Sequence, residues 1–311
     1  MICPQCRAEN ASERLYCKEC SHILEPLSSL WLRIEDFQTA SDSAALGLVK
    51  ATGILPYIVS QLLVKSRERK LRELITSEGV PFSRFHKLEA LGQEVAYAIC
   101  LETLPAIYVV TMARKPNAFT FGSDEAPIIV ADRRIVEALE TNELRALLGH
   151  EMGHIKSGHM LYHSLAQTLA GGIEASASLM GFNMISMPMR LALLAWQRES
   201  EFSADRAALV ASGSYFDLVS LFAKLAGKDN FSLEEGTSFV DNVAELFQTH
   251  PNLSERARAV FEFSKSEEYA RIVKKTVDRR FLRLASWSCR WCAAAKSIQA
   301  TFCPVCGKSQ I

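Results

Sequence analysis

The segment His150-Glu151-Met152-Gly153-His154 is followed 47 residues later by Glu201-Phe202-Ser203-Ala204-Asp205. On an α-helix, positions i and i+4 lie on one face, so His150 and His154 are predicted to direct ring nitrogens to one Zn²⁺. Glu151 then lies beside the open coordination position, where a general base is needed. The first segment therefore predicts a hydrolytic zinc site.

The second segment is predicted to supply the third ligand. Zinc sites of the thermolysin type take a carboxylate from another helix, and Glu201 offers one. Asp205 follows one helical turn later and is suited to bind the far ring nitrogen of a zinc-bound histidine. An all-histidine site would need Gly at position 157 and His at position 160, where this chain has Ser157 and Met160. His159 lies off the ligand face, and a polar role at the helix end is expected for it.

Four motifs make the chain resemble the HtpX-like and CAAX-prenyl-protease-like zinc metallopeptidases, which are gluzincins. In chain order they are Asn117-Ala118-Phe119, the zinc helix at 150–154, the segment 198–205, and Thr249-His250-Pro251 with Arg256. The resemblance covers about residues 80 to 262 and implies a peptidase with a catalytic Zn²⁺ and a polypeptide substrate.

The resemblance also implies roles outside the two zinc motifs. The strand Asn117-Ala118-Phe119 is expected to run beside the zinc helix, where an exposed edge would pair with an extended substrate. His250 is expected to assist catalysis, whereas a histidine before Pro251 is equally suited to a structural turn. Arg256 is expected either to stabilise the oxyanion or to have a structural role.

The predicted fold is α+β and mainly helical, with a small edge-strand sheet beside the zinc helix. Residues 81–98 are predicted to form a helix, and 106–111, 119–122 and 128–130 to form strands. The expected domains are an N-terminal zinc ribbon at 1–25, an apolar helix and charged linker at 26–79, a gluzincin metalloprotease domain at 80–265, a basic helix or linker at 266–286, and a C-terminal zinc ribbon at 287–311.

Eight of the nine cysteines form two copies of one spacing, in which two Cys-x-x-Cys pairs are separated by ten residues. A proline directly follows a cysteine in each copy, as expected for a tight turn whose thiolates converge on a tetrahedral Zn²⁺. Two structural zinc ions are therefore expected besides the catalytic one. The copies are Cys3, Cys6, Cys17 and Cys20, then Cys289, Cys292, Cys303 and Cys306. The ninth cysteine, Cys100, is predicted to be a buried apolar residue.

Four disulfides are the alternative to two zinc ribbons, and they would require a secreted protein. No basic start followed by an apolar run precedes Cys3, so the chain is expected to be cytoplasmic rather than secreted. Two apolar stretches, 44–64 and 159–195, offer fewer than the roughly 18 uninterrupted apolar residues of a membrane span. The first is predicted to be a buried or membrane-surface helix. The second, where membrane-bound relatives have transmembrane helices, is predicted to form a helical hairpin over the site or against a membrane surface.

The formal net charge of zero argues against a protein that binds nucleic acid over its whole surface. Positive charge nevertheless gathers near the C-terminus, in what we call the basic arm: Arg271, Lys274, Lys275, Arg279, Arg280, Arg283, Arg290, Lys296 and Lys308. Such a run is either a solvated face or a surface for acidic protein, anionic membrane or nucleic acid. The N-terminal ribbon has balanced charges and is expected to bind protein or to be structural.

Two functions remain open from the sequence. One is a zinc-dependent endopeptidase in which Glu151 assists a zinc-activated water, acting on unfolded or membrane-associated proteins. The other is a latent or inactive adaptor whose ribbons bind protein, lipid or nucleic acid. The intact Glu151 favours the enzyme, because an inactivated core has no use for a general base. Substrate and oligomeric state are not specified by the sequence.

Overall fold

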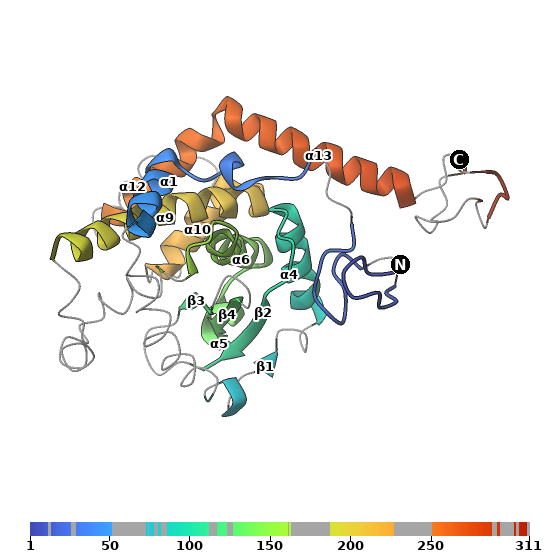
Figure 1. The fold of residues 1–311 in the computed structure, drawn as a ribbon, viewed down its shortest axis with the longest axis horizontal. Helices are drawn as coiled ribbons and strands as arrows, with labels where there is room; N and C mark the ends of the chain where they lie inside the picture. Colours follow the sequence, from blue (N-terminus) through green and yellow to red (C-terminus); the bar gives the residue numbers. More distant parts are fainter. Residues whose placement is uncertain are drawn as a thin grey trace.

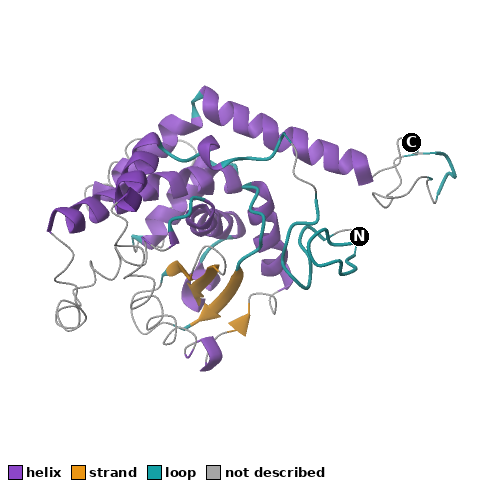
Figure 2. Ribbon diagram, viewed as in Figure 1, coloured by secondary structure: helices purple, strands orange, loops and turns teal. Residues whose placement is uncertain are grey.

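The structure is a computed structural model. It describes residues 1–11, 14–25, 29–51, 73, 75–77, 80–81, 86–111, 117–122, 127–160, 162, 187–226, 251–287, 291–292, 302 and 305–309. Helices pack over one side of a small sheet, and the long helix α13 runs along the outside of the helical layer (Figure 1). Colouring by secondary structure shows that helices predominate (Figure 2). The prediction of a mainly helical α+β fold is therefore confirmed.

The helical layer is centred on α6, which carries the first zinc motif, and on α9, which carries the second. Helix α6 is mostly buried because it lies between the sheet and the other helices. The described helices are the 3₁₀ turn η1 (Ile34–Asp36), α1 (Ala40–Ala51), α4 (His86–Ala98), α5 (Arg133–Ala138), α6 (Thr141–Lys156), α9 (Met187–Ser212), α10 (Tyr215–Leu225), α12 (Pro251–Ser264) and α13 (Glu267–Trp287).

The sheet has the strand order β1-β2-β4-β3, with β1 (Val80–Pro81), β2 (Ala106–Val110), β3 (Ala118–Gly122) and β4 (Pro127–Asp132). Strands β2 and β4 are parallel, whereas β3 is antiparallel to β4. Among the described residues β3 is thus an edge strand, and it contacts α6. The edge of the sheet therefore lies beside the zinc helix.

The predicted helix at 81–98 begins too early. Val80 and Pro81 instead form a short strand that pairs with β2, with Pro81 opposite Tyr108, and the helix begins at His86. Proline has no backbone N–H to donate and is compatible with the outermost strand of a sheet. The helical periodicity of the sequence did not reveal this boundary.

Two glycines allow α6 and α9 to cross closely. A Cβ atom on Gly149 would lie 2.6 Å from the Cβ of Ala211, and one on Gly153 would lie 2.7 Å from the Cβ of Ala207. Small residues on both helices let the backbones approach, so side chains that project beside the contact can meet across it. This crossing brings the two zinc motifs together.

Helix α13 is anchored by Arg279, which the sequence assigned to the basic arm. Arg279 is only 2% exposed, and its Nη2 donates to the carbonyl oxygens of Tyr97 and Ala98 at 3.0 and 2.9 Å. The guanidinium also contacts the Cys100 thiol, which is buried as predicted. The end of α4 supplies these acceptors because the last carbonyls of a helix have no partner within it. Arg279 is therefore an internal anchor, not part of a solvated surface.

Much of both apolar stretches lies outside the described residues, namely 52–64 and most of 159–195. The described start of the first stretch belongs to α1, which packs against α9. Within the part of the chain that the structure describes, no helix combines the length and the apolar character needed to cross a bilayer.

Candidate active site

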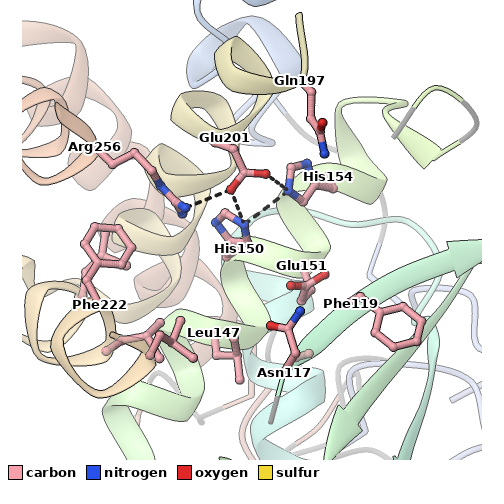
Figure 3. Close-up of a pocket in the computed structure, with 14 residues that line it drawn as sticks. Asn117, Phe119, Leu147, His150, Glu151, His154, Gln197, Glu201, Phe222 and Arg256 are labelled. Carbon is pink, nitrogen blue, oxygen red and sulfur yellow. Dashed lines mark hydrogen bonds and ion pairs between the residues drawn. The ribbon is translucent and has the colours of Figure 1, made fainter. Parts of the chain in front are cut away.

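The side chains of His150, His154 and Glu201 converge from α6 and α9 (Figure 3). The two Nε2 atoms lie 3.2 Å apart. Each lies 3.5 Å from one carboxylate oxygen of Glu201, Oε2 for His150 and Oε1 for His154. One donor atom from each residue lies within 4.8 Å of the other two. The structure thus brings together the three residues that the sequence predicts as ligands.

The donor atoms have the chemistry of a zinc site. The Nδ1 of His150 lies 2.9 Å from Oδ1 of Asp205. A carboxylate only accepts hydrogen bonds, so Nδ1 carries the hydrogen and the Nε2 of neutral His150 presents a lone pair to the site. Two imidazole nitrogens and a carboxylate facing one point repel one another unless a proton or a cation lies between them. This donor set fits Zn²⁺.

The protonation of His150 reflects the same crowding. Burial disfavours the imidazolium, but the hydrogen bonds and negative charges of Asp205 and Glu201 outweigh burial and raise the pKa of His150 to about 10. A metal ion replaces that proton when it binds, because only the neutral imidazole is a ligand. Zinc binding at neutral pH is therefore expected to release a proton from this site.

Arg256, on α12, clamps the two carboxylates of α9. Its Nε and Nη2 donate to the two carboxylate oxygens of Asp205 at 2.6 and 2.7 Å, and its Nη1 lies 3.0 Å from Oε2 of Glu201. The guanidinium also lies over the Phe222 ring, 4.9 Å from its centre. Burial lowers the pKa of Arg256, but the negative charges of Asp205 and Glu201 outweigh burial and raise this pKa above its usual value. The guanidinium therefore stays charged. Of the two roles expected for Arg256, this geometry favours the structural one.

Glu151 is only 6% exposed and is held from the sheet. Thr120, on β3, donates a hydrogen bond to Oε2 of Glu151, and its hydroxyl also lies 3.3 Å from the Glu151 carbonyl oxygen. The sequence interpretation missed Thr120. Side chains alternate along a strand, so a hydroxyl two residues after Ala118 was a readable signal for a polar contact on the same face.

A cavity of about 220 Å³ opens at these side chains. The predicted strand residues Asn117, Ala118 and Phe119 line it, and Asn117 lies next to Glu151 (Figure 3). The apolar residues of α10, together with Leu147 of α6, form one wall of the cavity. The lining residues that belong neither to this wall nor to the strand segment 117–119 are polar. The full lining is Asn117, Ala118, Phe119, Leu147, His150, Glu151, His154, Gln197, Glu201, Leu218, Leu221, Phe222, Leu225 and Arg256.

The cysteines of the N-terminal copy form a second cluster that could hold a metal ion. Cys3 Sγ lies 3.6 Å from Cys20 Sγ, and Cys6 Sγ lies 3.6 Å from Cys17 Sγ. Thiolates about 2.3 Å from a tetrahedral zinc are separated by about 3.8 Å, so these spacings fit. The described cysteines form no disulfides.

The pKa values of two of these thiols also favour a bound cation. Burial raises the pKa of Cys17, but the backbone N–H groups of Cys20 and Glu19 and the Asn10 amide outweigh it and lower the pKa to about 6. Burial and the three neighbouring thiols raise the pKa of Cys20 to about 12. Four thiolates therefore cannot coexist here without a positive ion to offset their charge.

The C-terminal copy is described only in part. Cys292 and Cys306 are described, whereas Cys289, Cys303 and also His250 lie outside the described residues. The described part repeats the N-terminal turn geometry. Phe302 bridges Ser309 as Ile2 bridges Glu9, and Gly307 has a positive φ of 69°, as Arg7 does at 66°.

A sequence profile for peptidase family M48 matches residues 83–263, which is more than half of the chain. The chain belongs to peptidase family M48. It is 30% identical over 274 residues to the "Plastoglobule-localized metallopeptidase 48, chloroplastic" of Arabidopsis thaliana, covering 80% of this chain and 78% of that protein. No solved structure matches the chain.

Bacterial relatives of this M48 chain are named as homologues of the protease HtpX. That of Sulfurihydrogenibium sp. (strain YO3AOP1) is 28% identical over 204 residues, covering 52% of this chain and 69% of the relative. That of Moorella thermoacetica (strain ATCC 39073 / JCM 9320) is 28% identical over 250 residues, covering 67% and 83%. The resemblance predicted from the sequence is confirmed, and the chain is an HtpX-like zinc metallopeptidase that acts on polypeptides.

Proposed function

We propose that this M48 peptidase is a gluzincin endopeptidase whose catalytic Zn²⁺ is bound by His150, His154 and Glu201. The observation that supports this most strongly is the convergence of three donor atoms within 4.8 Å in the cavity that Glu151 lines. A scaffold that had lost its activity would need no general base there. The domain that performs the reaction is proposed to span residues 80–265.

The reaction divides among the residues as follows. Zinc in this site supplies a Lewis acid that activates water and stabilises negative charge on the scissile carbonyl. Glu151 accepts the proton of the attacking water and then donates it to the departing amine. Thr120 holds one carboxylate oxygen of Glu151, which fixes the rotation of the other toward the cavity. Asp205 and Arg256 hold the ligands from behind.

The edge strand suggests how the substrate binds. Among the described residues β3 pairs with β4 alone, and we propose that its other edge pairs with an extended substrate chain. Asn117, Ala118 and Phe119 line the cavity at that edge, and the apolar residues of α10 line it elsewhere. Strand pairing of this kind recognises backbone groups more than side chains. Such broad recognition suits unfolded or membrane-associated proteins as substrates.

Cleavage of a peptide blocked at both ends tests the endopeptidase assignment. The zinc-loaded chain should cut internal bonds of an unfolded peptide that is acetylated at its N-terminus and amidated at its C-terminus. Mass spectrometry of the products locates the cuts. Release of single residues from unblocked peptides, together with no cleavage of the blocked one, would identify an exopeptidase instead.

Asp205→Asn should weaken zinc binding at the catalytic site by about 10- to 100-fold without unfolding the protein. The asparagine can no longer accept both from His150 Nδ1 and from two nitrogens of Arg256, so the imidazole loses its fixed orientation. Competition with a chelator measures the affinity. Asp217→Asn, in the first turn of α10, is the matched control; an unchanged affinity in folded Asp205→Asn would contradict the role.

We further propose that the N-terminal cysteines bind a structural zinc and that the C-terminal copy binds another. The N-terminal cluster is joined to the peptidase domain, because Tyr16 Oη donates to the Leu101 carbonyl at 2.8 Å and Ile23 N donates to the Glu102 carbonyl at 2.9 Å. These contacts support a structural role for the ribbon at 1–25.

Cys17→Ser should remove one zinc per chain and lower the thermal stability by several degrees, since metal binding supplies much of the folding free energy of such a small module. Native mass spectrometry counts the zinc ions, and calorimetry gives the melting temperature. Gln5→Ala changes an exposed side chain in the same module and should alter neither. An unchanged zinc count in Cys17→Ser would rule out the N-terminal metal site.

The basic arm is smaller than the sequence suggests. Arg279 is buried, and Lys275 forms an ion pair with Asp36 at 2.7 Å. Arg271 and Lys274 are exposed on α13. We propose that this exposed part contacts an acidic partner or an anionic membrane surface of a cytoplasmic compartment, and liposome flotation with and without anionic lipid tests it.

A further inference from the structure

Two fully buried polar residues lie behind His154. His159, just after α6, and Asp42, on α1, both have side chains that are 0% exposed. The Nδ1 atoms of His154 and His159 lie 3.1 Å apart, and Nε2 of His159 lies 2.9 Å from Oδ2 of Asp42. His159 is therefore near the site, as a contact of a ligand and not as a ligand itself.

Asp42, at the end of this chain of contacts, determines which ring nitrogens carry hydrogens. Asp42 accepts hydrogen bonds from Trp196 Nε1 at 2.9 Å, from Ser203 Oγ at 2.7 Å and from Gln38 Nε2 at 3.2 Å. With three donors directed at it, the buried Asp42 side chain is a carboxylate, which only accepts hydrogen bonds. The nitrogen of His159 that faces this carboxylate at 2.9 Å, Nε2, therefore carries a hydrogen.

The consequence reaches the metal ligand. A His159 ring whose one hydrogen is on Nε2 presents a lone pair at Nδ1, and this lone pair accepts a hydrogen from Nδ1 of His154. The Nε2 of His154 is then left with a lone pair, directed toward Nε2 of His150 and Oε1 of Glu201. The contacts behind His154 thus select the tautomer that can bind a metal.

Asp42 comes from a part of the chain outside the family match, which begins at residue 83. Helix α1 lies against α9 (Figure 1). Thr39 N donates to Ser203 Oγ at 3.0 Å, and Ser41 Oγ donates to Glu199 at 2.6 Å. These contacts fix α1 on the helix that carries Glu201, so Asp42 is held in place from both sides.

We propose that Asp42, acting through His159, positions His154 for zinc, so that helix α1 is a working part of the metal site. The inference rests on the proposed role of His154 as a ligand. Asp42 and His159 are positioning residues, because neither reaches the cavity. The arrangement extends the support of the zinc ligands: Asp205 fixes His150, and Asp42 fixes His154 through one more imidazole.

Asp42→Asn tests the inference with little change of volume. An amide cannot accept from all four neighbours, and an NH₂ group facing His159 would reverse its tautomer and place a hydrogen on Nε2 of His154. We expect the affinity of the catalytic site for metal to fall about 10- to 100-fold. Titration with Co²⁺ measures this affinity. Cobalt bound to cysteine thiolates has a charge-transfer absorption that cobalt bound to histidines and a carboxylate lacks, so the spectrum distinguishes the catalytic site from the cysteine cluster. Ser43→Ala, at an exposed position of the same helix, should leave the affinity unchanged.

His159→Phe provides a second variant that keeps a ring in place beside Trp196, whose ring centre lies 5.4 Å away. It should weaken metal binding as much as Asp42→Asn, and the double variant should be no worse than His159→Phe alone, because both changes break one chain of contacts. Native affinity in folded Asp42→Asn, or losses that simply add in the double variant, would overturn the inference.

His154→Ala separates this inference from the proposed function. Loss of metal in His154→Ala with native affinity in Asp42→Asn would reject the positioning role alone. Retention of native affinity in His154→Ala would reject His154 as a ligand and the proposed function with it.

Discussion

Glu151→Gln should retain its metal and its fold while its turnover of a blocked peptide falls by about 10²- to 10⁴-fold. Glutamine occupies the same space and can still accept the hydrogen bond from Thr120. It has no basic oxygen, so it neither removes a proton from the attacking water nor returns one to the departing amine. The loss should therefore appear mainly in kcat, with a smaller change in KM.

The measurement pairs steady-state cleavage with metal content for each variant. Glu137→Gln, an exposed carboxylate on α5, is the matched control and should behave as the native protein. A folded, metal-loaded Glu151→Gln with native turnover would remove Glu151 from the mechanism. If the native chain cleaves nothing while holding its metal, the latent or adaptor function becomes the better explanation.

Gly153→Ala should destabilise the protein by about 1–3 kcal/mol and weaken metal binding together. The added Cβ would lie 2.7 Å from Ala207 Cβ, and also 3.2 and 3.3 Å from the backbone Cα and O of Ala204. Backbone atoms cannot turn aside as a flexible side chain can, so α6 and α9 must separate. Because the metal ligands come from both helices, separation moves Glu201 away from the two histidines.

Denaturant unfolding with and without excess zinc distinguishes the two effects. Gly47→Ala is the control, since nothing lies within 4 Å of a Cβ at that position of α1, and it should be neutral or stabilise by up to about 1 kcal/mol. A Gly153→Ala variant as stable as native, with native metal affinity, would show that the crossing of α6 and α9 tolerates more space than the structure indicates.

The chemistry of the site was predictable because it follows short spacings. His150 and His154 are four residues apart on one helix, so their common direction follows from helix geometry alone. Glu201 and Asp205 repeat this spacing, and the structure brings His150, His154 and Glu201 together with Asp205 behind them.

The contacts that support the site were not predictable in the same way. His159 contacts His154 across five positions but lies beyond the end of α6, where helical spacing predicts no direction. Thr120 contacts Glu151 across 31 positions, and Asp42 contacts His159 across 117 positions. No periodicity links residues so far apart, and an aspartate at the start of α1 looks like an ordinary helix-end residue. Arg279 was misjudged for a related reason, because a count of charges does not show which arginine has buried acceptors.

The sequence by itself determined the metal chemistry, the family, the mainly helical α+β class and the arrangement of eight cysteines in two copies of one spacing. All of these depend on residue types at short, regular spacings. The tertiary structure decided that Asp205 lies beside His150, that Asp42 lies beside His159, how closely α6 and α9 approach, and that α1, outside the family match, packs on α9. Those features depend on packing between distant segments, where burial leaves a polar group only the partners that the fold brings to it.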